Sequence, residues 1–333
     1  MTLKDKLSIY LPAVEEQLKQ TVSSYLPKGD PEMEEMVAYH MGWTGEGAGA
    51  EAQGKHIRPV LVLLAAESAG GDWHSALPVA AAVELIHNFS LVHDDIQDQS
   101  PLRRGRPTVW AKWGIAQAIN VGDILFTLAQ TALLDLPVET WAPINTLLQE
   151  TCLRLTEGQY LDLAYEKKAA LPLDAYWKMI GGKTASLLAF SVQAGAITAG
   201  VDMDRQRAFF EFGYNLGLAF QVQDDLLGIW GDSAILGKST ESDLVSGKKT
   251  LPVAYALCNE REFSLRWRSG PVQPQDVPSL VTLLEQEGAQ TFAQSHADRL
   301  THAALDHLER AAPTGSAGEA LRELTAHLLN RTS

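Results

Sequence analysis

Apolar residues recur with the period of an α-helix along most of the chain, and this pattern limits the possible folds most strongly. Helical patterns cover residues 75–98, 112–135, 142–168, 174–199, 204–229, 250–262, 278–311 and 316–330. Alternating strand patterns bounded by turn residues are not found in the sequence. Segments 75–98 and 204–229 are apolar nearly all round, which is typical of central helices. The sequence therefore predicts an all-α protein.

Polar, glycine-containing breaks at 42–54, 231–249 and 269–278 interrupt the helical patterns, but composition does not change across them. With 333 residues, the chain is long enough to bury a sizeable core. We therefore expect a single domain over residues 1–333, in which residues of about 54–252 carry the motifs.

Acidic residues outnumber basic ones by 41 to 27, for a net charge of −14, which disfavours nucleic acids and anionic membranes as partners. No uncharged apolar run reaches the roughly 18 residues of a membrane span. The first residues, MTLKDKLSIYLPAVEEQLKQ, lack the apolar segment of a signal peptide. Cys152 and Cys258 lie far apart, as expected of two core thiols in a reducing compartment. These features predict a cytoplasmic protein.

Two acidic clusters close the two most apolar helical segments. In LVHDDIQD, Asp94 and Asp98 are four residues apart and share one helix face, and His87 lies seven residues before Asp94. QVQDDLLGIWGD carries Asp224 and Asp225, followed by Asp232. One such cluster is most simply a helix end emerging into water. Two clusters together favour carboxylates that bind Mg²⁺, which takes oxygen ligands and is usually shared with substrate phosphates.

Basic residues gather beside glycines, where backbone N–H groups can also reach phosphate oxygens. The groups are GKHIRP (Lys55, His56, Arg58), LRRGR (Arg103, Arg104, Arg106), GGKT (Lys183, Thr184), LGK (Lys238) and SGKKT (Lys248, Lys249). In an acidic chain this grouping predicts a ligand rich in phosphate, held partly through metal and partly by direct contacts. GGKT lacks the upstream glycine of a Walker A loop.

With these motifs in this order, the chain resembles the trans-type isoprenyl diphosphate synthases, also called polyprenyl synthetases. The resemblance runs from about Lys55 to Pro252 and rests on GKHIRP, ELIHNFSLVHDDIQD, LRRGRPT, GQxxDL, GGKT, FQVQDD and LGK…SDL…GKKTLP. It implies an all-α barrel around a deep central cavity, usually in a homodimer. It also implies the reaction, in which an allylic diphosphate ionises and isopentenyl diphosphate adds head to tail.

The resemblance implies a role for each motif position. Metal ligands would be Asp94, Asp98 and Asp224, with Asp95 and Asp225 beside them, holding three Mg²⁺ ions that Mn²⁺ can replace. The allylic diphosphate would be held by Arg103, Lys183, Thr184, Gln221 and Lys238. Isopentenyl diphosphate would be held by Lys55, Arg58, His87 and Arg104. Asp94, Asp95, Asp98, Asp224, Asp225, Lys183 and Lys238 would form the catalytic set.

Two positions depart from the family pattern. His56 stands where the family usually has arginine, so we expect a weaker or pH-sensitive isopentenyl diphosphate site. The second acidic motif ends in Gly228 instead of an aspartate, and Asp232 follows four residues later. This leaves the outer metal ligand open but not Asp224.

Phe89 and Ser90, five and four residues before Asp94, are the candidates that set product length. On an ideal helix Ser90 lies more nearly under Asp94, so blocking by Phe89 depends on helix packing. An aromatic residue followed by a small one resembles synthases that make C20 chains. We therefore expect geranylgeranyl diphosphate, with farnesyl diphosphate (C15) as the nearest alternative. Plain core packing is the other interpretation of Phe89.

Three other functions remain as alternatives. The His93–Asp94 pair is compatible with an HD-type metallophosphohydrolase, but the histidines do not gather near Asp224 in sequence. A terpene cyclase would share the metal ligands without needing GKHIRP and His87. A non-catalytic partner subunit would be expected to have lost an acidic motif or its lysines, which are largely kept here.

Overall fold

The computed structural model describes residues 1–166, 168–231 and 242–329. The chain divides into two compact units, and each is described by itself. Unit 1 comprises Met1–Leu147, Ser191–Asp202 and Pro313–Leu321. Unit 2 comprises Leu148–Phe190, Met203–Ala312 and Arg322–Ser333. The single-domain expectation stays a prediction.

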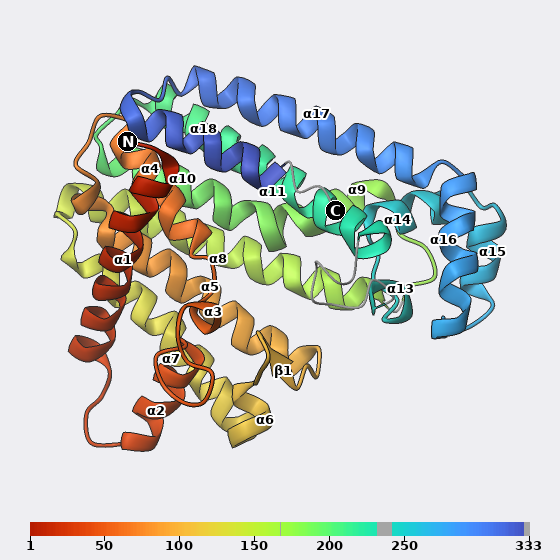
Figure 1. The fold of residues 1–333 in the computed structure, drawn as a ribbon, viewed down its shortest axis with the longest axis horizontal. Helices are drawn as coiled ribbons and strands as arrows, with labels where there is room; N and C mark the ends of the chain where they lie inside the picture. Colours follow the sequence, from red (N-terminus) through yellow and green to blue (C-terminus); the bar gives the residue numbers. More distant parts are fainter. Residues whose placement is uncertain (167, 232–241, 330–333) are drawn as a thin grey trace. The chain divides into compact units, whose positions relative to one another are not determined.

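Helices dominate both units (Figure 1). Unit 1 contains α1 (Leu3–Tyr25), α2 (Pro31–His40), α3 (Ala50–Gln53), α4 (Ile57–Ser68), η1 (Trp73–Ala76), α5 (Leu77–Gln97), β1 (Leu102–Arg103), β2 (Arg106–Pro107), α6 (Val109–Trp113), α7 (Ile115–Ala132) and η2 (Leu133–Asp135). Unit 2 contains α9 (Leu173–Ile180), η3 (Gly181–Ala185), α11 (Met203–Trp230), α13 (Ser242–Val245), α14 (Leu251–Cys258), α15 (Glu262–Arg268), η4 (Pro274–Asp276), α16 (Val277–Gln286) and α17 (Ala289–Arg310). Three helices contribute residues to both units: α8 (Val138–Glu166), α10 (Ser186–Thr198) and α18 (Gly315–Leu329).

The all-α prediction is confirmed, with differences in detail. The expected helix over 278–311 is two helices, because Gly288 adopts φ 80° and ends the first of them. Helices α1, α2 and α4 were not among the predicted segments. The short hairpin of β1 and β2 was also not predicted, since two-residue strands leave no alternating pattern. Both cysteines are free, but only Cys152 is buried, so the expectation of two core thiols is wrong for the exposed Cys258 at the end of α14.

Helix α5 is the central helix of unit 1. It packs against α7, α4 and α1, and its side chains from Pro78 to Ile86 are all buried. By length and composition, the segment Trp73–Gln97 could also cross a membrane, with a mean hydropathy of 1.4 over 18 residues. However, 67% of that window is buried inside the protein, as in the core helix that the sequence predicted.

Helices α5 and α7 pack together, and at one contact a histidine ring of α5 lies on a glycine of α7. A Cβ atom on Gly122 of α7 would collide with the imidazole ring of His93 on α5. Because glycine leaves that space open, His93 lies against the α7 backbone, with Nε2 3.4 Å from the Ile119 carbonyl oxygen. This contact fixes the end of α5 that carries the first acidic motif.

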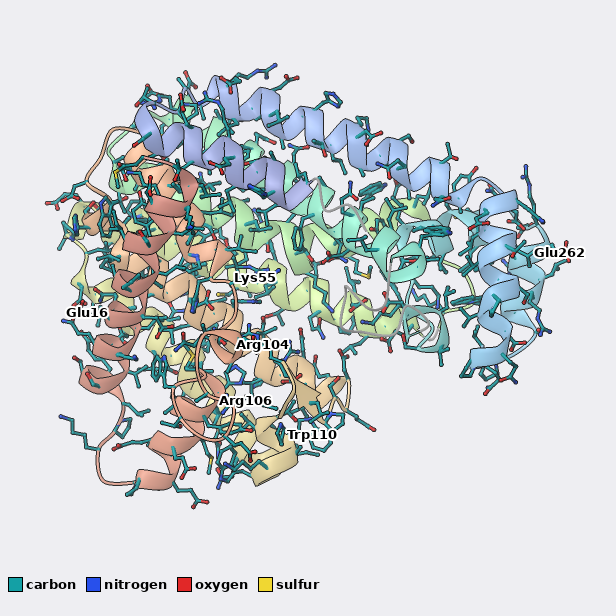
Figure 2. The ribbon with its side chains drawn as sticks, in the orientation of Figure 1. Glu16, Lys55, Arg104, Arg106, Trp110 and Glu262 are labelled. Carbon is teal, nitrogen blue, oxygen red and sulfur yellow. The ribbon has the colours of Figure 1, made fainter. Side chains whose placement is uncertain are left out.

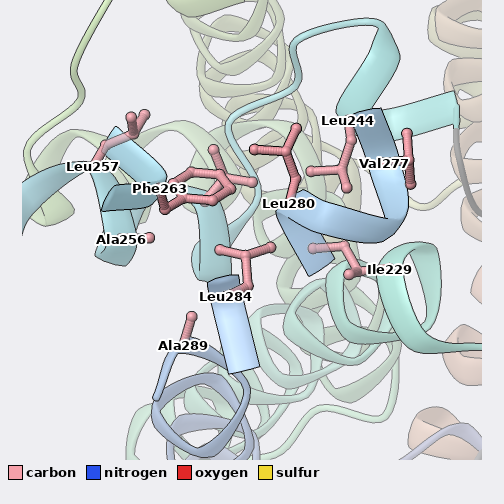
Figure 3. Close-up of a cluster of buried hydrophobic side chains, with 10 residues drawn as sticks. Ile229, Leu244, Ala256, Leu257, Phe263, Val277, Leu280, Leu284 and Ala289 are labelled. Atoms are coloured by element: carbon pink, nitrogen blue, oxygen red, sulfur yellow. The ribbon is translucent and has the colours of Figure 1, made fainter. Parts of the chain in front are cut away.

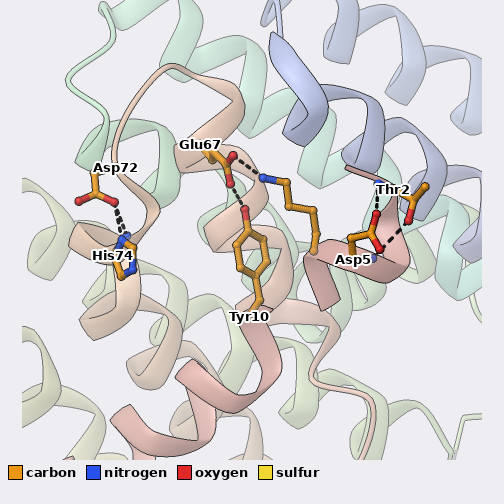
Figure 4. A network of polar contacts seen from close by, with 7 residues as sticks. Thr2, Asp5, Tyr10, Glu67, Asp72 and His74 are labelled. Carbon is orange, nitrogen blue, oxygen red and sulfur yellow. Dashed lines mark hydrogen bonds and ion pairs between the residues drawn. The ribbon is translucent and has the colours of Figure 1, made fainter. Parts of the chain in front are cut away.

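A polar network joins α1 to α4 in unit 1 (Figure 4). Lys6 and Tyr10 of α1 both donate to the carboxylate of Glu67 on α4. The pKa of Tyr10 is raised by burial and by Glu67. The Tyr10 ring also packs on Trp73, with centroids 4.9 Å apart. The N-terminal helix is therefore fastened to the core of unit 1.

In unit 2, α11 packs along α17, and its C-terminal end lies on a separate apolar cluster (Figure 3). The cluster consists of Ile229, Leu244, Val253, Ala256, Leu257, Phe263, Val277, Leu280, Leu284 and Ala289. These residues come from α11 and from α13 to α17, so they support the helix end that carries the second acidic motif.

Candidate functional site

The first acidic motif lies at the C-terminal end of α5, as the sequence predicted. The three aspartates differ in exposure, because successive positions on the helix face in different directions. Asp95 is only 3% exposed, whereas Asp94 is half-buried and Asp98, the C-cap, is exposed. Asp94 and Asp98 are therefore the members of this motif that remain accessible to a ligand.

Asp95 is bound by Arg103 in a bidentate ion pair. The Arg103 Nε atom lies 2.9 Å from each carboxylate oxygen, and Nη2 lies 2.8 Å from Oδ1. Burial raises the pKa of Asp95, and the Arg103 guanidinium opposes that rise. The acidic and basic blocks of LVHDDIQDQSPLRRGR are thus linked through their middle aspartate, while Asp94 and Asp98 stand outside this pair.

The β1–β2 hairpin separates the two neighbouring arginines. Arg104 and Gly105 form its two-residue turn with φ of 52° and 74°, as a type I′ turn requires. Unlike Arg103, Arg104 bonds to the backbone: its Nη1 donates to the Ala52 carbonyl oxygen at 2.7 Å. A Cβ atom on Gly54 would collide with this guanidinium, which places Arg104 beside the GKHIRP segment. Figure 2 labels Arg104 and Lys55 in this region.

Arg106, the third arginine of LRRGR, is a structural residue. Its guanidinium donates to three backbone carbonyls, those of Tyr39 at 3.0 Å, Thr44 at 2.7 Å and Glu46 at 2.9 Å. It also stacks over the Tyr39 ring, 4.1 Å from the ring centroid. These contacts hold the glycine-rich segment that precedes α3.

The four residues predicted to hold isopentenyl diphosphate lie in one region of unit 1. His87 of α5 is half-buried, and desolvation together with nearby Arg58 and Arg104 lowers its pKa well below 6.5. Lys55 is exposed and follows Gly54, on which Arg104 packs. Arg58 and Arg104 therefore surround the neutral imidazole of His87, with Lys55 nearby.

His40, at the end of α2, belongs to the same group and was missed by sequence reasoning. Burial, Arg103 and Arg104 lower its pKa to about 3, so it is also neutral. The sequence does not mark His40 as a site residue, because it lies outside every motif. Folding brings it near Arg103 and Arg104.

In the second acidic motif, as in the first, one aspartate is buried and the one before it is more exposed. Asp224 is half-buried near the end of α11, whereas Asp225 is 6% exposed. The Asp225 carboxylate accepts hydrogen bonds from the Tyr176 hydroxyl (2.6 Å), the Gln221 amide (3.0 Å) and the Leu251 backbone N–H (2.8 Å). Burial raises the pKa of Asp225 to about 7 despite these donors. Asp225 thus ties α9 and the start of α14 to α11.

The GGKT motif forms η3, a single turn of π-helix between α9 and α10. Such a turn often marks a functional site. Cβ atoms on Gly158 of α8 or on Gly182 would collide with backbone atoms of the facing segment, so these glycines allow η3 and α8 to touch. Lys183 then forms an ion pair with Asp162 of α8, and the Thr184 hydroxyl donates to the Gln221 amide oxygen at 2.7 Å. Lys183, Thr184 and Gln221, predicted to bind the allylic diphosphate, are therefore neighbours in unit 2.

The space beside Gly228 is occupied by another acid. A Cβ atom at this position would lie 2.5 Å from Oδ2 of Asp243, on α13. Lys249 is a structural residue, since it is buried and donates to the carbonyls of Glu166 and Gly247 at 3.1 and 2.8 Å. Asp232 and Lys238 lie outside the described residues.

Phe89 points from α5 toward α7. Its ring meets those of His93 and Phe126 edge to face, with centroids 4.8 and 5.1 Å apart. The Ser90 hydroxyl donates to the His87 carbonyl within its own helix. The sequence did not predict the contact with Phe126. An aromatic residue in the helical segment 112–135 could have suggested a partner for Phe89.

The carboxylate oxygens of Asp94, Asp98 and Asp224 are the kind of ligand that a hard divalent cation prefers. In the described ranges, no three His, Cys, Asp or Glu side chains converge into a metal cage. That agrees with Mg²⁺, which typically takes one or two protein carboxylates and keeps water and substrate phosphate as its other ligands.

Comparison with known proteins identifies the family. A sequence model of the polyprenyl synthetase family matches residues 48–283. The (2E,6E)-farnesyl diphosphate synthase of Mycobacterium tuberculosis is 38% identical over 326 residues, which cover 95% of this chain and 91% of that protein. The chain belongs to the polyprenyl synthetase family. It is therefore a prenyltransferase, and members of this family bind diphosphate through divalent metal.

Other polyprenyl synthetases extend the comparison. A geranylgeranyl diphosphate synthase of Mycobacterium tuberculosis is 40% identical over 279 residues, 81% of this chain and 79% of that protein. The crystal structure of geranylgeranyl pyrophosphate synthetase from Pyrococcus horikoshii superposes with a TM-score of 0.89 at 33% identity, covering 99% of this chain and 98% of that one. The family excludes the metallophosphohydrolase alternative. Because these relatives are named for different products, they leave product length open.

Proposed function

We propose that this synthetase condenses isopentenyl diphosphate with an allylic diphosphate, head to tail and with Mg²⁺, and that its main product is geranylgeranyl diphosphate. The observation that carries the product assignment is the ring of Phe89, one turn before Asp94 and packed against Phe126. Farnesyl diphosphate is the alternative, and the name of one relative favours it.

The site residues take the following roles in this proposal. Asp94, Asp98 and Asp224 hold Mg²⁺, three ions in all, which Mn²⁺ can replace. The metal would stabilise the charge that develops on the departing diphosphate. Lys183, Thr184, Gln221, Arg103 and Lys238 bind the allylic diphosphate. Lys55, Arg58, His87 and Arg104 bind isopentenyl diphosphate.

The chain's own residues would also protect the reactive allylic cation. Water would capture such a cation, so the surrounding wall must be apolar. Helix α5 offers an almost uninterrupted apolar surface before Asp94. Asp95 and Asp225 take part indirectly, because their oxygens are bound by protein donors and they fix the aspartates beside them.

We further propose a cytoplasmic homodimer. Large apolar side chains are exposed on α7, at Ile115 (54%) and Ile119 (43%), and on α8, at Val138 (75%) and Leu153 (73%). A second copy of the chain would bury them, and sedimentation velocity would show whether the protein is dimeric.

A product assay tests the reaction. The purified protein is incubated with isopentenyl diphosphate and each allylic diphosphate in turn, with Mg²⁺ or with a chelator. The dephosphorylated products are then separated by chain length. We expect mainly C20 product with Mg²⁺ and none with the chelator. Absence of elongation from every allylic substrate would refute the proposal, and a C15 end product would favour the alternative.

The Phe89→Ala variant tests the product-length assignment. Removing the ring should lengthen the main product by one or more isoprene units, because the growing chain can pass the vacated position. Phe292→Ala is a matched control, since Phe292 also packs on a histidine one turn later, His296 at 4.5 Å, and on a second aromatic ring, Tyr255. An unchanged product spectrum for Phe89→Ala would show that the ring only packs the core.

A further inference from the structure

His56 lies between two carboxylates in the interior of unit 1. Its Nε2 is 3.0 Å from Oε1 of Glu15, and its Nδ1 is 3.1 Å from Oε1 of Glu84. The His56 and Glu84 side chains are only 6% and 2% exposed. His56 has φ 45°, a left-handed backbone conformation, immediately before α4 begins. The side chain is thus directed into the protein rather than toward a substrate.

The two carboxylates belong to different helices and have further partners. Glu15, on α1, accepts a hydrogen bond from the Trp43 indole at 2.8 Å, and Lys19 lies 3.9 Å away. Glu84, on α5, accepts one from the Asn88 amide at 3.0 Å. His56 therefore joins the GKHIRP segment to both α1 and α5.

The same segment is also held at its other end. Arg104 donates to the Ala52 carbonyl and packs on Gly54, just before Lys55. With His56 fixed by two carboxylates, Lys55 lies between two anchored points. Its backbone is consequently positioned before any substrate arrives, which limits the ordering that binding requires.

The charge of His56 also affects the neighbouring cations. Glu84 is buried within electrostatic range of His87 and Arg58, which belong to the proposed isopentenyl diphosphate site. An imidazolium beside Glu84 compensates its negative charge. Without it, the buried Glu84 carboxylate would lie uncompensated next to a site for an anion and would compete with diphosphate for Arg58.

We propose that His56 is a positioning residue for isopentenyl diphosphate: held between Glu15 and Glu84, it fixes the backbone of Lys55 and keeps Arg58 and His87 available to the diphosphate. This inference rests on the proposed function, because it assumes that these residues bind isopentenyl diphosphate. The electrostatics agree. Burial opposes the charge on both groups, but the two carboxylates outweigh it and raise the pKa of His56 to about 9, and His56 in turn lowers the pKa of Glu84 to about 2.

The experiment compares steady-state kinetics of His56→Gln and His56→Arg with the unaltered chain between pH 7 and pH 10. At pH 7, His56→Gln should raise the KM for isopentenyl diphosphate roughly tenfold, equivalent to about 1.4 kcal/mol. The KM for the allylic diphosphate should change little. His56→Arg should restore the KM, since a guanidinium can also pair with two carboxylates and stays charged. His74→Gln is the matched control, because His74 also pairs with a carboxylate, Asp72 at 2.7 Å, but at the surface.

The pH dependence separates positioning from a merely structural role. In the unaltered chain, the KM for isopentenyl diphosphate should rise as the pH passes about 9, where His56 loses its proton. In His56→Arg that rise should be absent, and any rise shared by both proteins belongs to other groups such as Lys55. This comparison remains decisive if His56→Gln does not fold.

Two results would overturn the inference. One is a His56→Gln variant that folds and keeps the KM of the unaltered chain; the other is the same pH profile for the unaltered chain and for the His56→Arg variant. Lys55→Ala distinguishes these from failure of the proposed function. If Lys55→Ala does not raise the KM for isopentenyl diphosphate, the assignment of the substrate site is wrong. If it does while His56→Gln has no effect, only the role of His56 is wrong.

Discussion

In each of the two aspartate pairs, the second aspartate is buried and bound by protein donors, whereas the first is more exposed. Asp95 pairs with Arg103, and Asp225 accepts hydrogen bonds from Tyr176, Gln221 and Leu251. An aspartate pair at a helix end thus combines two functions. One carboxylate anchors the helix end, and we propose that the adjacent one binds metal.

Asp95→Asn and Asp94→Asn should separate these functions. Asp95→Asn leaves Arg103 without its ionised partner and should lower the free energy of unfolding by about 2 kcal/mol. Asp94→Asn should lower that free energy by less than Asp95→Asn does, because Asp94 is less buried, and should reduce turnover roughly a hundredfold or more. Urea unfolding and product formation measure the two effects. Equal effects of both variants on stability would contradict the division.

Spacing alone predicted the accessible aspartates but not the partners of the buried ones. Asp94 and Asp98 share a helix face because they are four residues apart, and that relation is visible in sequence. Contacts between residues far apart in sequence are not visible in this way. One example is the ion pair of Glu15 with His56, which lies about 40 residues later in the chain. No local pattern marks such a pair, so the sequence predicted a pH-sensitive site from His56 but not the two carboxylates that hold it.

At the scale of elements, glycines decide where segments touch. Gly122 lets α5 meet α7, and Gly158 lets α8 meet η3. The helical pattern over 174–199 runs through GGKT without a break, so the π-helical turn was not predicted. The hairpin at Arg104 was likewise hidden, because only Gly105 of its two turn residues is a residue type that commonly adopts positive φ.

Gly158→Ala tests the contact between α8 and η3. The added methyl group would meet the Lys183 backbone, so η3 must shift and the Lys183 ammonium with it. We expect a loss of about 1–3 kcal/mol in stability and a higher KM for the allylic diphosphate. Thermal unfolding and initial rates provide the two readouts. Thr156→Ala, at an exposed position of the same helix, serves as the control. A KM that is unchanged would show that η3 does not position Lys183.

At the scale of the whole molecule, the protein and its proposed diphosphate substrates carry charges of the same sign. The net charge of −14 repels diphosphates at long range, so binding depends on a few local groups of cations. Arg58, Arg103 and Arg104 form one such group in unit 1, around His40 and His87. Composition alone therefore disfavoured nucleic acids as partners but not phosphate-rich small molecules.

Global stability should depend on pH through His56. Its pKa is about 9 in the folded protein against an ordinary 6.5, so its stabilisation is complete below pH 6.5 and is lost as the pH rises through 9. Relative to His56→Arg, the unaltered chain should lose up to about 3 kcal/mol over that interval. Urea unfolding of both proteins at pH 6, 8 and 9.5 measures the difference. Parallel stability curves would contradict a charged His56.

The anchored middle aspartates also bear on how such a protein would change over generations. In a duplicated copy released from catalysis, selection would still act on folding. If Asp94 and Asp224 have the roles proposed above, mutations there would be tolerated earlier than mutations at the more deeply buried Asp95 and Asp225, on which α5, α9, α11 and α14 depend. A descendant that has lost catalytic activity would therefore be recognised by aspartate pairs in which only the second aspartate is retained.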